Sequence, residues 1–122
     1  MGVAYVRGAV KSIREQSPLR LDVSFFDWDG APETPTTIHY RVDLLGAKPA
    51  VNIRAWTQFS PVGQSVSITL DVDDNEFYSA QGNSEVHIVT VAANQGQADE
   101  MNEQFLYEVE QVPHDLDIAA GN

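Results

Sequence analysis

The chain has 122 residues, a length that suits one domain, and 43% of them are hydrophobic, as in ordinary globular proteins. It has no cysteine, which excludes disulfides, thiolate metal sites and a cysteine nucleophile. All seven basic residues lie within positions 1–54 with six of the 18 acids, so positions 55–122 hold the remaining twelve acids and no base. Nucleic-acid binding needs a basic stripe, so we expect no nucleic-acid partner.

The N-terminal segment lacks a basic region followed by an apolar core, so we expect no signal peptide. No stretch approaches the ~18 apolar residues of a membrane span, so we also expect no membrane partner. The sequence therefore predicts a soluble, unprocessed chain.

Alternation of apolar and polar residues predicts strands, because successive side chains of a strand point to opposite faces. The clearest run begins at Leu19, and turn residues such as Gly30 and Gly46 separate such runs. Gly8 weakens the first strand, and the segment 94–104 could form a single helical turn. The predicted strands, in chain order, are 3–11, 19–26, 37–44, 50–58, 65–72, 85–93 and 104–112.

The run at 85–93 is rich in β-branched residues on both faces, which places it at the centre of a sheet. Residues in the middle of apolar faces should be buried; they are Val23, Tyr40, Ile68, Ile88 and Tyr107. Seven short strands with this spacing predict an all-β, seven-stranded immunoglobulin-like or fibronectin-III-like β-sandwich. Residues 1–112 form this single domain, and 113–122 form an acidic C-terminal tail.

Catalytic and metal sites find little support in the residue pattern. His39 and His87 should lie on exposed faces of separate strands and His114 in the tail, without the spacing of a metal site. Nucleophile and phosphate-binding motifs are absent, so we expect no enzyme, no catalytic residue and no cofactor.

The densest carboxylate cluster spans residues 71–76 and partly matches a calcium-binding loop. Asp71, Asp73 and Asn75 occupy the first three ligand positions, but Glu76 replaces the needed glycine and no flanking helices are predicted. A strand-ending turn, in which these side chains cap backbone amides, is the favoured interpretation, with no metal.

The tryptophans allow two interpretations. Trp28 could stack a sugar between the carboxylates of Asp27 and Asp29, but a loop with Trp28 folded over the end of the core is favoured. Trp56 is interpreted as a packing or interface residue.

Several segments together resemble small immunoglobulin-like proteins of tailed bacteriophages, found among virion structural genes. The resemblance covers about residues 15–112. It rests on Pro35-Thr36-Thr37-Ile38-His39-Tyr40-Arg41-Val42-Asp43, Trp56-Thr57, Ser65-Val66-Ser67-Ile68-Thr69-Leu70 and Val89-Thr90-Val91-Ala92-Ala93.

This resemblance implies a non-enzymatic virion structural protein, either a capsid decoration or a head–tail accessory protein. Such a protein is made in the host bacterial cytoplasm and located in the virion, and its partners are phage capsid or head–tail proteins. A homo-oligomer is left open. The alternative is a cell-surface adhesion or carbohydrate-binding β-sandwich module, because the same fold serves both.

Large apolar side chains on outward or loop positions are candidate anchors for a partner. The predicted partner-binding residues are Phe26, Trp28, Trp56 and Arg41. The charge distribution suggests that strands 65–72, 85–93 and 104–112 carry an acidic surface. The earlier strands would then supply the basic positions Arg7, Lys11, Arg20 and Arg41.

Overall fold

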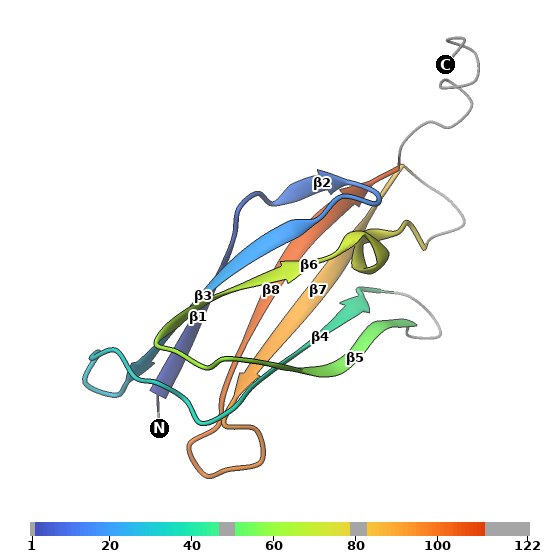
Figure 1. Ribbon diagram of the computed structural model, residues 1–122. Coiled ribbons are helices and arrows are strands. Elements are labelled where there is room, and N and C mark those ends of the chain that lie inside the picture. Colours follow the sequence, from blue (N-terminus) through green and yellow to red (C-terminus); the bar gives the residue numbers. More distant parts are fainter. Residues whose placement is uncertain (1, 47–50, 79–82, 112–122) are drawn as a thin grey trace, which may run out of the picture.

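The fold consists of eight strands and one short 3-10 helix (Figure 1), seen in a computed structural model that describes residues 2–46, 51–78 and 83–111. The strands and helix are β1 (Gly2–Gly8), β2 (Ser12–Arg14), β3 (Leu19–Asp27), β4 (Ile38–Leu44), β5 (Val51–Phe59), β6 (Ser65–Leu70), η1 (Val72–Asn75), β7 (Ser84–Ala93) and β8 (Met101–Glu110). All seven predicted strands are present, and β2 is additional.

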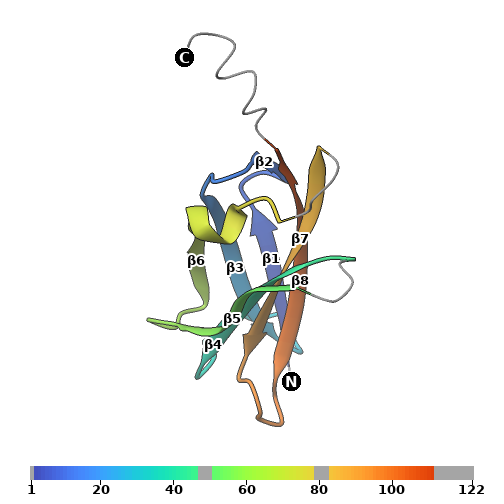
Figure 2. The same ribbon diagram turned by 90° about the vertical axis from the view of Figure 1, so that its right-hand side faces the viewer.

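Two sheets pack against each other as two layers (Figure 2). The three-stranded sheet has the order β1-β3-β6, and the five-stranded sheet has the order β2-β8-β7-β4-β5. Neighbouring strands are antiparallel except β2, which pairs with β8 in parallel. The protein is therefore all-β, and its two packed sheets are consistent with an immunoglobulin-like β-sandwich.

The core lies between the sheets and is built from alternate residues of each strand. In β3, Leu19, Leu21, Val23 and Phe25 all point inward and are at most 2% exposed. Tyr40, Ile68 and Tyr107 are also buried, as the alternation predicts; these side chains come from β4, β6 and β8.

Strand β7 is the middle strand of its sheet, which confirms the central position predicted for 85–93. Its register differs from the prediction, since Ile88 is only half-buried whereas Val89 and His87 point inward and are 0% exposed. Both faces of this run are apolar, so its alternation cannot tell which face is inner. The expectation of an exposed His87 was wrong for the same reason.

Three local details also differ from the sequence-based expectation. Residues 94–100 form turns rather than a helical turn, and β8 begins earlier than predicted, at Met101. Val72 belongs to η1 and not to the preceding strand.

The predicted tail, 113–122, lies outside the described residues. No helix of the described part is long and apolar enough to cross a membrane.

The acidic and basic surfaces predicted from the charge distribution form only in part, since among the three later strands only β8 carries exposed or half-buried acids, Glu103, Glu108 and Glu110. Strand β6 carries no charged side chain, and the single acid of β7, Glu85, is buried. The basic positions are also divided between the sheets, since Arg7 and Arg20 lie on the three-stranded sheet and Arg41 on the five-stranded one. The two halves of the sequence, which differ in charge, do not form two separate sides of the molecule. Strands that follow one another in the chain, such as β3 and β4, belong to different sheets.

Candidate binding surfaces on the two sheets

One candidate surface is the outer side of β1 and β3, which we call the β1–β3 face. Antiparallel pairing places Val3 opposite Phe26, Tyr5 opposite Ser24 and Arg7 opposite Asp22. These pairs alternate with inward pairs such as Ala4 and Phe25, so they share one face. Apolar, aromatic and charged pairs therefore follow one another along the strands.

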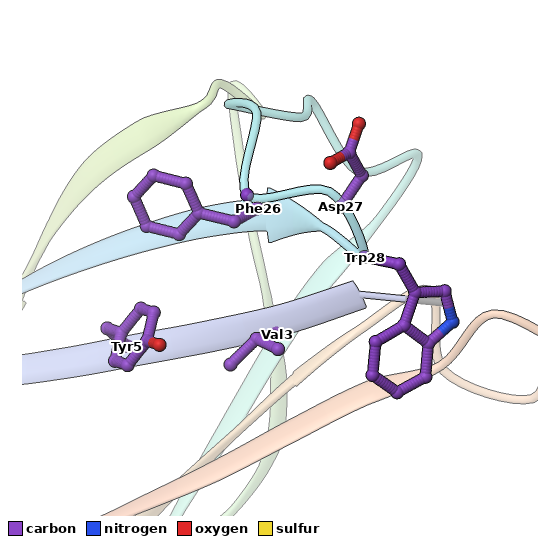
Figure 3. A pocket seen from close by; sticks show the side chains of 6 residues that line it. Val3, Tyr5, Phe26, Asp27 and Trp28 are labelled. Atoms are coloured by element: carbon purple, nitrogen blue, oxygen red, sulfur yellow. The ribbon is translucent and has the colours of Figure 1, made fainter.

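A hollow of about 350 Å³ lies at one end of the β1–β3 face (Figure 3). Figure 3 shows Tyr5 and Phe26 on one side of Val3 and Trp28 on the other. The rings of Tyr5 and Phe26 meet edge to face at 5.6 Å between centroids. Trp28 is 69% exposed, so the prediction that it folds over the core was wrong.

Trp28 is held outward by the turn that contains it. Asp27 Oδ1 accepts hydrogen bonds from the amides of Asp29 and Ala31, both at 2.9 Å. Gly30 takes a φ of 84° and donates its amide to the Asp27 carbonyl at 3.0 Å. The Asp27 carboxylate therefore stabilises the loop, while the indole projects beside the hollow.

A second hollow of about 330 Å³ continues along the same face. It shares Tyr5 and Phe26 with the first and adds Arg7, Asp22 and Ser24. Asp22 accepts a hydrogen bond from the Ser67 hydroxyl at 2.8 Å, and Arg20 lies 3.5 Å from the same carboxylate oxygen. The two hollows together line the face from Trp28 to the Arg7–Asp22 pair.

The other candidate surface lies on the outer side of the five-stranded sheet, where Arg41 covers Trp56. The guanidinium carbon is 5.6 Å from the centre of the indole ring, a cation–π distance. Arg41 also donates two hydrogen bonds to Asp43, each of 2.8 Å, and Trp56 is 40% exposed. Of the four predicted partner-binding residues, Phe26 and Trp28 thus line one hollow at the three-stranded sheet. Arg41 and Trp56 contact each other on the five-stranded sheet.

The Arg41–Asp43 contact changes the protonation behaviour of both groups. Partial burial alone would raise the pKa of Asp43, but hydrogen bonds from Arg41 and Asn52 outweigh burial and lower it. The hydrogen bond to Asp43 raises the pKa of Arg41. The pair is therefore charged at neutral pH, and the positive charge of Arg41 is largely compensated.

A buried polar cluster joins β7, β8 and η1, and it was not predicted from the sequence. His87 Nε2 lies 2.6 Å from Glu85 Oε2, and the Tyr107 hydroxyl donates to Asn75 Oδ1 at 2.7 Å. The side-chain nitrogen of Asn75, Nδ2, donates to the Ser17 carbonyl at 2.6 Å. The sequence offered one signal, namely polar residues within otherwise apolar strands. The alternation did not show which face of these strands is buried, so it could not predict that the polar residues point into the core.

Burial governs the chemistry of this cluster. It raises the pKa of Tyr107 strongly, and the charge of Asp74 raises it further. His87, Glu85, Tyr107 and Asn75 are each at most 7% exposed, so a dissolved substrate does not reach them. Their observed contacts fix strand ends to η1, which is a structural role.

Of the carboxylates at 71–76, Asp71 and Asp74 cap η1, which confirms the favoured interpretation for Asp71 but not for Asp73 and Asn75. Asp71 Oδ1 accepts the amides of Asp73 and Asp74, and Asp74 Oδ2 accepts the Asp71 amide. Arg54 donates to Asp74 at 2.6 Å and to Asp71 at 3.2 Å. In the described part of the chain, no three His, Cys, Asp or Glu side chains are grouped to hold a metal.

The two other histidines are His39 and His114. His39 is half-buried rather than exposed, and its buried Nδ1 has no hydrogen-bond partner among the described residues. His114 lies outside the described residues.

No known protein-family model matches the chain, and no curated protein matches it. Among solved structures it is similar to a β-glucosidase from Listeria innocua, with TM-score 0.53 and 13% identity. That match covers 91% of this chain and 16% of the glucosidase chain.

Two further structures are more distant. A superoxide reductase from Ignicoccus hospitalis has TM-score 0.49 and 16% identity, covering 88% of this chain and 80% of that chain. A conjugative transposon lipoprotein from Bacteroides eggerthii has TM-score 0.47 and 9% identity, covering 87% and 95%. At these identities, likeness concerns the fold alone.

Proposed function

We propose that this chain is a non-enzymatic structural protein of a tailed-phage virion, acting as a capsid decoration or head–tail accessory protein. It would be made in the host bacterial cytoplasm and bind capsid or head–tail proteins on the particle. The sequence resemblance over about residues 15–112 supports this role, and the immunoglobulin-like sandwich agrees with it.

The observation that carries the proposal is the position of Trp56, a large apolar side chain that lies outside the core beside Arg41. Trp56 is 40% exposed on the five-stranded sheet, although the space between the sheets is already filled by other side chains. Exposed aromatic side chains with an adjacent arginine are enriched where proteins bind one another. The Trp56–Arg41 pair is therefore assigned to the contact with the particle.

An uptake experiment tests this assignment. Particles lacking the chain are incubated with purified wild-type protein, Trp56→Ala, Arg41→Ala or the control Val62→Ala, which removes an exposed loop side chain. Trp56→Ala should shorten retention about tenfold or more, because a desolvated aromatic anchor sets the dwell time. Arg41→Ala should have a smaller effect, since Asp43 already compensates its charge.

Uptake of the wild-type protein should also be faster at low salt, because long-range charge interactions mainly set the association rate. If particles do not take up the protein, or if both substitutions behave like Val62→Ala, the proposal is wrong.

One observation favours the second candidate, an adhesion or carbohydrate-binding module. Trp28 stands in solvent beside an open aromatic hollow instead of covering the core. That geometry provides the exposed ring on which a sugar could stack.

A further inference from the structure

We propose that the β1–β3 face binds a linear, uncharged glycan that lies along the strands between Trp28 and Arg7. The inference stands on the geometry of this face and does not depend on the virion role. It assigns a ligand class to the two adjoining hollows.

The aromatic residues provide stacking surfaces of the kind that sugars use. Trp28 and Tyr5 are 69% and 58% exposed, so both rings are open to a ligand. The electron-rich face of an aromatic ring attracts the weakly positive C–H groups that line one side of a pyranose. Tyr5 is braced by its edge-to-face contact with Phe26, so little side-chain freedom is lost on binding.

The shape of the site favours a chain over a single small molecule. The hollows of about 350 and 330 Å³ share Tyr5 and Phe26, so they are consecutive positions on one face. Each is near the lower size limit of a small-molecule pocket, ~300 Å³. Both are open, so a ligand gains more contact by extending through the two than by filling one.

Three polar groups of the face can form hydrogen bonds with the hydroxyl groups of a ligand. Among the described residues, no partner is found for the Tyr5 hydroxyl, the Trp28 indole N–H or the Arg7 guanidinium. Ser24 and Asp22, in the second hollow, add a hydroxyl and a carboxylate, which already contact Ser65 and Ser67, respectively. Donors and acceptors thus alternate with rings, which matches a ligand with hydroxyls around apolar ring faces.

Charge and backbone pairing distinguish a glycan from other ligands. The charged residues that line the hollows are Arg7, Asp22 and Asp27, so the site has no excess of positive charge with which to attract an anionic ligand. Strand β3 is hydrogen-bonded to β1 on one side and β6 on the other. The backbone of β3 is therefore not available to pair with an extended peptide, and recognition across β3 must come from side chains.

Tryptophan fluorescence offers a direct test, because the chain has two tryptophans and Trp28 is the one at the site. In a Trp56→Phe background, Trp28 is the only tryptophan. This protein is titrated with cellohexaose, maltohexaose and chitohexaose, and with hexagalacturonate as the anionic comparison. At least one neutral hexasaccharide should give a saturable change below about 5 mM.

Two further variants in the same background locate the binding. Tyr5→Ala should weaken the affinity about tenfold or more. Leu106→Ala, which removes an exposed side chain from the other sheet, should change it less than about twofold. Circular dichroism confirms that each variant is folded.

Three outcomes would overturn the inference: no response to any neutral hexasaccharide, a response to hexagalacturonate alone, or equal effects of Tyr5→Ala and Leu106→Ala. Particle uptake without glycan binding would leave the virion proposal standing and remove this one. Glycan binding without particle uptake would leave the glycan inference standing and remove the virion proposal.

Discussion

At the scale of single residues, Tyr107 is the link between the core and the buried polar cluster. Its ring packs among the core side chains, and its hydroxyl donates to Asn75, which is 0% exposed. The side chain of Asn75 in turn donates a hydrogen bond to the Ser17 carbonyl. The backbone carbonyl of Asn75 accepts a hydrogen bond from the Gln16 amide. One hydroxyl thus connects β8, η1 and the segment before β3.

Replacing Tyr107 with Phe should lower the free energy of unfolding by about 1–3 kcal/mol, because a buried acceptor on Asn75 loses its donor. Urea denaturation at pH 7 measures this change. Tyr5→Phe is the matched control, since it removes an exposed hydroxyl and should cost almost nothing. A cost for Tyr107→Phe as small as that of the control would mean that the hydrogen bond does not matter.

The same variant should alter stability in alkali. Burial, followed by the charge of Asp74, raises the folded-state pKa of Tyr107 above the unfolded value of about 10. A raised pKa stabilises the folded state fully below pH ~10, and this contribution is lost as pH rises further. The melting temperature of Tyr107→Phe should therefore fall less steeply above pH ~10 than that of the wild type.

At the scale of elements, period-two alternation predicted most strands because one face of each is polar. Strand β3 shows this well, since its apolar positions Leu19 to Phe25 are the buried ones. For β7 the alternation predicted the strand but not its inward face, because Val86 and Ile88 are as apolar as Val89 and Val91. It also missed β2, because three residues, Ser12–Arg14, are too few to show a period.

The candidate surfaces were predictable in part. Phe26, Trp28, Trp56 and Arg41 were selected as large or basic residues at outward positions, and all four lie at least partly outside. Their division between two sheets was not predictable, because it depends on which strands pair. Tyr5 was not predicted as part of the β1–β3 face for the same reason, because only the pairing of β1 with β3 brings it beside Phe26.

The element η1 leads to a prediction about calcium. All four carboxylate oxygens of Asp71 and Asp74 already accept hydrogen bonds from backbone amides or from Arg54. Millimolar calcium should therefore leave the melting temperature unchanged, as should magnesium in a parallel control. Saturable stabilisation by micromolar calcium, abolished in Asp71→Asn, would instead make this cluster a metal site.

At the scale of the whole molecule, the sandwich separates two surfaces of different character. The five-stranded sheet presents Trp56 beneath a charge-compensated arginine, whereas the three-stranded sheet presents the open rings of Trp28 and Tyr5. A module with two such faces can contact a large assembly through one and leave the other exposed. The virion proposal uses the first face, and the glycan inference uses the second.

The most direct measurement of the central claim is the protein composition of purified particles. The virion proposal predicts that particles of the encoding phage contain this chain at a fixed copy number per particle, as determined by quantitative mass spectrometry. A Trp56→Ala genome should yield particles with fewer copies, while Val62→Ala should match the wild type. Purified particles that contain no copies of the chain would contradict the account.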